Sequence, residues 1–213
     1  MNSPQSISKA VYGALRGIAG GQREQGCELC GAALAGAHAH LLRLSNREVL
    51  CACEPCAVLF SHRGDGKRFF RIPRDVKRIE GFILSDSDWS ALRLPIELAF
   101  FVNNSSEGRV MAYYPSPAGC TESMLDLNAW EQLALKNPEL EHMQPDVECL
   151  LINRTRGRRD YFTAPIDQCY RLTGLIRRHW RGLSGGDEVW REIEKFFEAL
   201  RESATCLTEI VHA

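Results

Sequence analysis

The sequence lacks several features that would place it in a broad functional class. Its 213 residues contain no run of about 18 uncharged apolar residues, and residues 1–21 lack the apolar centre of a secretory signal. Lys and Arg number 26 against 27 Asp and Glu, so the formal charge of −1 gives no global attraction to nucleic acid or to an anionic membrane. We therefore expect a soluble, cytoplasmic protein without membrane insertion, in which any contact with a polyanion is local.

The signatures of common enzyme classes are also missing. The chain has no GxSxG motif, no Walker-type loop, no dinucleotide-binding fingerprint and no HExxH helix. Cys120 is a candidate nucleophile in residues 113–123, which we predict to be a loop because they are rich in turn-forming residues, but no histidine is adjacent to it in sequence. These absences favour a protein that is not an enzyme, and we assign no catalytic and no cofactor-binding residue.

Cysteine, in contrast, is abundant and clustered. Five of the nine cysteines lie within thirty residues, and the other four are isolated. Because thiols stay reduced in the cytoplasm, such clustering favours a metal site over a disulfide framework. The isolated ones are Cys120, Cys149, Cys169 and Cys206.

Two CxxC pairs carry the strongest signal in the sequence. Two residues between cysteines allow both thiolates to reach one tetrahedral ion, and Gly31 relieves the turn after the first pair. Cys51 lies two residues before the second pair, on the same face if the segment is a strand, and is an alternative ligand or a small buried side chain. The metal ligands that we predict are Cys27, Cys30, Cys53 and Cys56.

The residues around the two pairs indicate a small zinc fold. The segment 40–51 reads as two strands around a turn at Ser45–Asn46, and the apolar residues after Cys56 resemble the first turns of a helix. A knuckle, a hairpin and a second ligand pair at a helix start are the layout of a treble-clef or zinc-ribbon-like module. We expect Zn²⁺, which would hold together a module too small to fold alone. Rubredoxin-like iron or an iron–sulfur cluster is chemically compatible.

Histidines near the cysteines suggest a different function. His38, His40 and His62, together with Asn46, are similar to the layout of HNH nucleases, although the histidine pair is split and Ala57 stands where such enzymes commonly have a histidine. A basic stretch from Lys67 to Arg78 includes two phenylalanines, a composition that can bind nucleic acid. An HNH-like nuclease or a nucleic-acid-binding zinc module is therefore an alternative, with surface or strand histidines as the simpler interpretation.

Composition along the chain predicts three parts. Residues 1–24 form an arm or a short helix, residues 25–80 the metal-binding module and a basic linker, and residues 81–213 an α+β domain. In the last part we predict an antiparallel sheet and two C-terminal helices, from the periodicity of apolar residues and from turn and cap residues. The predicted strands are 95–102, 109–114, 147–152 and 159–165, of which 147–152 is a nearly continuous apolar run typical of a buried central strand. The predicted helices follow Asp126, span 167–181 and follow Gly185–Gly186.

Several segments resemble an uncharacterised bacterial protein family whose genes lie beside those of nickel–iron hydrogenases. The resemblance covers nearly all of the chain after about residue 25. It implies an accessory or assembly role, with a hydrogenase subunit or a maturation factor as the partner, and it supplies no catalytic residues. If the cysteines held iron, the protein would instead be an electron-transfer partner of the hydrogenase. The segments are CELCGAAL, LCACEPCAVLF, AFFVNNSSEGRVMAYYPSPAGCTESML, LLINRTRG, PIDQCYRLTGLIRRHWRGLSGG and VWREIEKFF.

Overall fold

The computed structural model describes residues 26–61 and 68–207. The predicted arm 1–24, His62 and Lys67 lie outside the described residues. The strands are β1 (Ala39–Arg43), β2 (Glu48–Ala52), β3 (Phe69–Arg71), β4 (Lys77–Ile79), β5 (Leu98–Asn104), β6 (Arg109–Ser116), β7 (Gly119–Ser123), β8 (Glu148–Asn153), β9 (Asp160–Pro165) and β10 (Thr205–Leu207). The helices are α2 (Glu54–Phe60), α3 (Asp86–Ala91), α4 (Leu127–Lys136), α5 (Ile166–His179) and α6 (Gly186–Ser203), with short 3₁₀ turns at Pro138–His142 and Thr155–Gly157.

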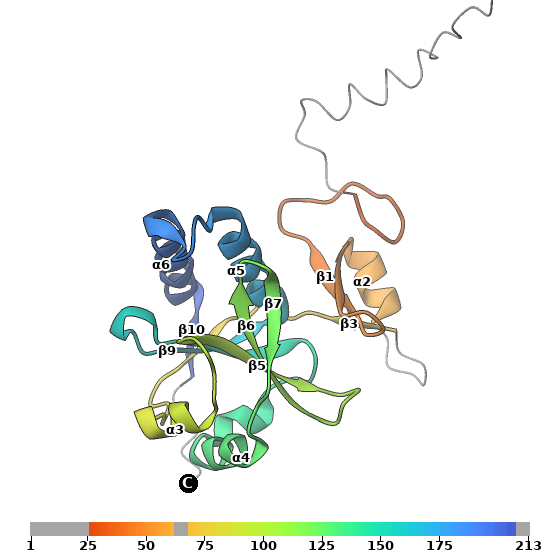
Figure 1. The fold of residues 1–213 in the computed structure, drawn as a ribbon. Helices are drawn as coiled ribbons and strands as arrows, with labels where there is room; N and C mark the ends of the chain where they lie inside the picture. The colour runs from red at the N-terminus through yellow and green to blue at the C-terminus, as the bar shows by residue number, and fades with distance from the viewer. Residues whose placement is uncertain (1–25, 62–67, 208–213) are drawn as a thin grey trace, which may run out of the picture.

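The strands form two sheets, and the predicted α+β class is confirmed. A three-stranded sheet has the order β2-β1-β3, and a seven-stranded sheet has the order β10-β4-β9-β8-β5-β6-β7. All pairings are antiparallel except that of β10 with β4. The small sheet with α2 lies to one side of the larger α+β body, as Figure 1 shows. Of the stretch predicted as a linker, β3 joins the small sheet and β4 joins the large one.

The large sheet is buried on both faces. One face packs against α5 and α6, and the other packs against α3 and α4 (Figure 1). In β8, Cys149 and Leu151 face the first layer, whereas Leu150 and Ile152 face the second. Because successive side chains of a strand point to opposite faces, a strand covered on both sides favours apolar residues at consecutive positions. This burial explains the nearly continuous apolar run that predicted a central strand.

The predicted hairpins and helices of the large domain are confirmed, with small shifts of their ends. Strands β5 and β6 pair across residues 105–108, and β8 and β9 pair across the turn near Gly157. The carboxylate of Asp126 caps α4 by accepting hydrogen bonds from the N–H groups of Asn128 and Ala129. In the described part of the chain, no helix combines the length and the apolar character that crossing a bilayer would require.

The prediction that residues 113–123 form a loop is wrong. Most of this segment belongs to β6 and β7, which pair from Ala112 with Ser123 to Ser116 with Gly119. Pro115 does not disrupt β6, although proline has no N–H to donate. The pairing of β6 with β5 ends at Tyr113, so β5 requires no hydrogen bond from residue 115. The turn-forming residues therefore mark a tight hairpin, and Cys120 lies on an edge strand.

Strand β1 gives the small sheet two different faces. Ala39 and Leu41 pack toward the cysteines, in a cluster that includes Cys27 and Cys56. Leu42, on the opposite face, is fully buried within the core between the large sheet and α5–α6. One face of the small sheet is therefore held by the large domain, whereas the other depends on the cysteine module for its packing.

Candidate metal centre

The four predicted cysteines come from two segments that the fold brings together. Cys27 and Cys30 lie in a turn closed by a hydrogen bond from Gly31 N–H to the carbonyl of Cys27 (2.7 Å), and Gly31 has a φ of +78° that favours glycine. Cys53 is the N-cap residue of α2, and Cys56 lies in the first turn of that helix. The N–H of Glu28 donates to the carbonyl of Cys51 (2.9 Å), which fixes the first segment against the end of β2.

The separation of the sulfur atoms suits one metal ion. The four Sγ atoms lie within 4.8 Å of one another, and the Sγ atoms of Cys30 and Cys53 are 3.7 Å apart. A disulfide requires about 2.05 Å, and all nine cysteines are free thiols. Thiolates bound at about 2.3 Å to a tetrahedral ion are separated by about 3.8 Å, close to the observed distance.

Backbone N–H groups favour the thiolate form of one of the four. The pKa of Cys27 is lowered to about 6, chiefly because the N–H of Cys53 donates to its sulfur, with smaller contributions from the N–H groups of Leu29 and Cys30. Burial of the sulfur opposes this effect. Such N–H···S contacts stabilise the charged ligand that a metal needs, because the thiolate, not the thiol, is the ligand.

The remaining thiols cannot all ionise without a cation. The pKa of Cys56 is raised to about 12, first by its hydrogen bond with Cys53 and then by burial and by the neighbouring thiols. Four negative charges at these separations repel one another unless a positive ion lies between them. The donor set is all sulfur, which suits zinc and also iron. The residues present therefore fit a structural metal ion.

The module has little else to hold it together on this face. Its buried apolar cluster contains only small residues besides Leu41, and partly buried Leu29, Leu34 and Phe69 pack against it. A core of this size provides little free energy of folding, which small domains usually supplement with a metal or disulfides. The cluster consists of Cys27, Ala39, Leu41, Ala52, Cys56 and Ala57.

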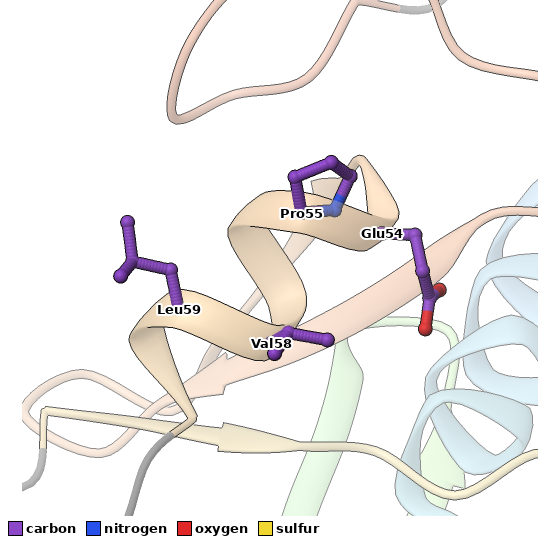
Figure 2. A pocket seen from close by; sticks show the side chains of 4 residues that line it. All are labelled: Glu54, Pro55, Val58 and Leu59. Atoms are coloured by element: carbon purple, nitrogen blue, oxygen red, sulfur yellow. The ribbon is translucent and has the colours of Figure 1, made fainter.

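Helix α2 carries the second ligand pair and also exposes apolar side chains. Val58, Leu59 and Phe60 are 50%, 69% and 42% exposed, and Pro55 lies beside them at the start of the helix. Figure 2 shows Pro55, Val58 and Leu59 along α2, with Leu59 pointing away from the helix axis. A shallow hollow is lined by these residues and Glu54. The metal centre would therefore fix the orientation of an apolar surface.

Cys51 does not group with the other four cysteines. It pairs directly with His40 across β1 and β2, and its sulfur lies within 4.8 Å of ring nitrogens of His38 and His40. Sequence reasoning gave these histidines no partner, and it did not identify Asp167 of α5, which lies 2.6 Å from Nδ1 of His40. The alternation of His38 and His40 was the only sequence signal, because Asp167 is 127 residues away from His40.

The basic residues that suggested nucleic-acid binding are largely paired with acidic residues in the described part of the chain. Arg71 and Arg74 both contact Glu54, at 2.5 and 3.8 Å. Two further arginines beside the β8–β9 turn are paired as well: Arg158 contacts Glu194 at 2.5 Å, and Arg159 contacts Asp86 at 2.8 Å. These ion pairs satisfy part of the positive charge within the protein itself.

Comparison with known proteins identifies the family of this chain but gives no activity. Neither the curated proteins nor the solved structures include a match to this chain. The model of one family matches residues 26–204, which include both CxxC pairs, both sheets apart from β10, and helices α2 to α6. The chain therefore belongs to DUF5947, a family of unknown function.

Proposed function

We propose that the protein is a zinc-stabilised accessory protein that presents helix α2 to a protein partner. The observation that carries this proposal is the convergence of the four Sγ atoms within 4.8 Å at the start of a helix whose outer side is apolar. Structural zinc sites fix short elements that have no sufficient core of their own. Exposed aliphatic and aromatic residues on a fixed helix are typical of protein-binding surfaces.

The partner that we propose is a subunit or a maturation factor of a nickel–iron hydrogenase. The resemblance to proteins encoded beside hydrogenase genes supports this choice. The mixed surface charge and the internal pairing of Arg71 and Arg74 make a protein a better partner than a polyanion. An assembly role also requires no catalytic residue.

Metal analysis tests the first half of the proposal. Purified protein should contain zinc bound to the four cysteines, and Cys30→Ser should remove it, whereas Cys206→Ser, on an exposed thiol outside the cluster, should not. Visible absorbance separates zinc from iron, because thiolate-bound iron is coloured and zinc is not. A coloured protein with stoichiometric iron would favour the electron-transfer alternative. Equal metal content in Cys30→Ser and in the wild type would refute the ligand assignment.

A binding assay tests the second half. Immobilised wild-type protein should retain purified hydrogenase subunits or maturation factors encoded near its gene, and Leu59→Ser should weaken that binding at least tenfold. Leu135→Ser is the matched control, because Leu135 is a leucine on α4 with 78% of its surface exposed. Equal binding by Leu59→Ser and the wild type would exclude α2 as the contact. Absence of binding to every one of these proteins would contradict the hydrogenase role.

A further inference from the structure

A second group of metal-ligand side chains lies on the other side of the small sheet. His38 precedes β1, His40 is within β1, and Cys51 is opposite His40 on β2. One ligand atom from each of the three lies within 4.8 Å of the other two. His40 and Leu42 lie on the same face of β1, so this group is on the side of the large domain, whereas Leu41 faces the four cysteines.

Hydrogen bonds at the Nδ1 atoms determine which nitrogens are free to bind. Nδ1 of His38 lies 3.0 Å from the carbonyl oxygen of Ala35, and Nδ1 of His40 lies 2.6 Å from Oδ2 of Asp167. A carbonyl and a carboxylate only accept hydrogen bonds, so each Nδ1 must carry the proton. In the neutral rings, each Nε2 therefore keeps its lone pair.

These two lone pairs face one another. Nε2 of His38 and Nε2 of His40 are 3.2 Å apart, with the rings edge to face. Two acceptors at this separation need a positive species between them, either a proton or a metal ion. Imidazole nitrogens bound at about 2.0–2.1 Å to one tetrahedral ion are separated by about 3.4 Å, which is close to the observed distance.

We propose that His38, His40 and Cys51 bind a second transition-metal ion, distinct from the one in the four-cysteine site. Two imidazoles and one thiolate form a donor set that suits Zn²⁺. Three protein ligands leave a fourth position open to water, as in zinc sites that bind or activate small molecules.

Asp167 has the position of an outer carboxylate that orients a ligand. Metal-binding histidines usually donate their second N–H to such a group, which fixes the ring and raises its basicity. The other carboxylate oxygen, Oδ1, is buried and has no hydrogen-bond partner. Asp167 lies in the first turn of α5, so the proposed ion would connect the small sheet to the large domain through His40.

The open side of this site faces a cavity. The cavity, of about 260 Å³, is lined by His38, His40 and Asp167, and also by Arg74 and Gln168. Its volume is sufficient for water and a small ligand at the fourth position. Arg74, which also contacts Glu54 at 3.8 Å, and Gln168 provide hydrogen-bond donors on the wall, which favours a polar ligand.

The competing interpretation is a shared proton with no metal. His40 would then be an imidazolium that donates from Nε2 to His38 and from Nδ1 to Asp167. Both interpretations satisfy the same three contacts, but only the metal site requires Cys51. Metal stoichiometry therefore distinguishes them.

The test is metal titration of the full chain after removal of metal by a chelator. With Zn²⁺, the wild type should bind two equivalents, and His40→Ala should bind one. His142→Ala, a histidine outside the group, should still bind two. Cys30→Ser should lose the four-cysteine ion and keep the one that depends on His40, so that failure of either site can be recognised separately. Co²⁺ added as the second equivalent, to protein whose four-cysteine site already holds Zn²⁺, should show a thiolate charge-transfer band that Cys51→Ser abolishes.

A second variant covers the case in which His40→Ala misfolds and loses both ions. Asp167→Asn replaces no proposed ligand. It should lower the affinity for one of the two Zn²⁺ ions 10- to 100-fold and leave the affinity for the other unchanged. A wild type that binds a single equivalent retained by His40→Ala would overturn the proposal. Unchanged affinities in Asp167→Asn together with two equivalents in His40→Ala would also overturn it.

Discussion

Arg47 donates a hydrogen bond to Oδ1 of Asp146 at 3.0 Å and thereby connects the β1–β2 turn to the start of β8. A second nitrogen of Arg47 lies 3.3 Å from the carbonyl oxygen of Asp146. Asp146 is fully buried, and its Oδ1 also accepts from the N–H of Ser105. The guanidinium is therefore the cation that balances a buried carboxylate at the junction between the two sheets.

Substitution Arg47→Ala should lower the free energy of unfolding by about 3 kcal/mol, because it leaves the buried carboxylate of Asp146 without its cation. The matched control is Arg43→Ala. Arg43 pairs with Glu48 at 2.7 Å in the same hairpin, but both side chains are substantially exposed, and such pairs contribute less than about 1 kcal/mol. Urea denaturation of both variants measures the difference, and equal losses would contradict the role of Asp146.

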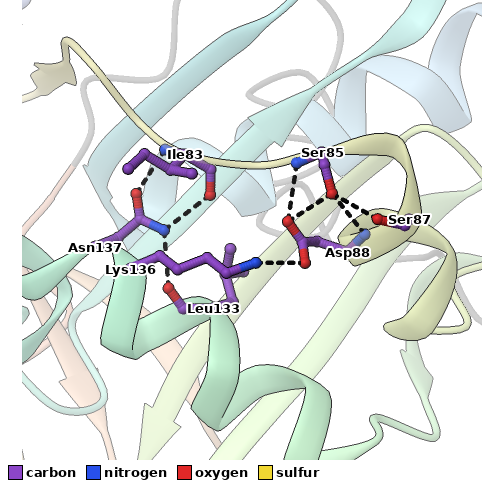
Figure 3. Close-up of polar contacts among 7 residues, drawn as sticks. All are labelled: Ile83, Ser85, Ser87, Asp88, Leu133, Lys136 and Asn137. Carbon is purple, nitrogen blue, oxygen red and sulfur yellow. Dashed lines mark hydrogen bonds and ion pairs between the residues drawn. The ribbon is translucent and has the colours of Figure 1, made fainter.

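Asp88 provides a stability contribution that should depend on pH. Its pKa is lowered to about 2, first by the ammonium of Lys136 and then by the hydroxyl and the N–H of Ser85 (Figure 3). These contacts complete a capping box at the start of α3 and join α3 to α4. Because the folded pKa is below the usual value of about 4, the contribution is present above pH 4 and is lost as the pH falls toward 2.

We expect Asp88→Ala to be about 1 kcal/mol less stable than the wild type at pH 7, and this difference to shrink between pH 4 and pH 2. Denaturant unfolding of both proteins across this pH range is the measurement. Asp126→Ala, which removes the cap of α4 without an ion pair to Lys136, is the control for loss of a cap alone. A difference that stays constant down to pH 2 would show that the ionised carboxylate is not responsible.

The sequence was sufficient for features that depend on local or periodic patterns. The apolar stripe of α6 and the continuous apolar run of β8 follow from burial on one side and on two sides, respectively, and each lies within a single segment. The two CxxC pairs were recognisable because the spacing within each pair is itself the requirement for chelation. The structure brings these four sulfurs together, as predicted, and the metal itself stays a prediction.

Features that depend on contacts distant in sequence were not predictable. Strands β4 and β10 have three residues each and pair with each other across more than 120 positions. The pairing of His40 with Asp167 likewise requires α5 to pack beside the small sheet, which no local pattern indicates. Pro115 was expected in a loop because proline lacks the N–H that a strand pairing needs. Only the register reveals that the pairing of β6 with β5 stops at Tyr113, before Pro115.

Two core thiols should be inert in the native protein. The sulfurs of Cys149 and Cys169 lie 3.0 Å apart between β8 and α5, and both residues are fully buried. Burial, together with the adjacent thiol, raises the pKa of Cys169 well above its usual value. Iodoacetamide at pH 8 should therefore label exposed Cys206 at least tenfold faster than Cys169, as read by mass spectrometry of peptides. Comparable rates would show that this part of the core opens readily.

Removal of metal should loosen the cysteine module more than the large domain. The four-cysteine face has only a small apolar cluster, whereas Leu42 and β8 lie in an extensive core. We expect a chelator to increase amide exchange at least tenfold in residues 27–34 and α2, and to change exchange in β8 and β9 little. Hydrogen exchange with mass spectrometry, repeated after zinc is restored, measures this effect. Uniform acceleration across β8 would mean that metal stabilises the whole fold, and unchanged exchange in α2 would mean that the four cysteines hold no structural ion.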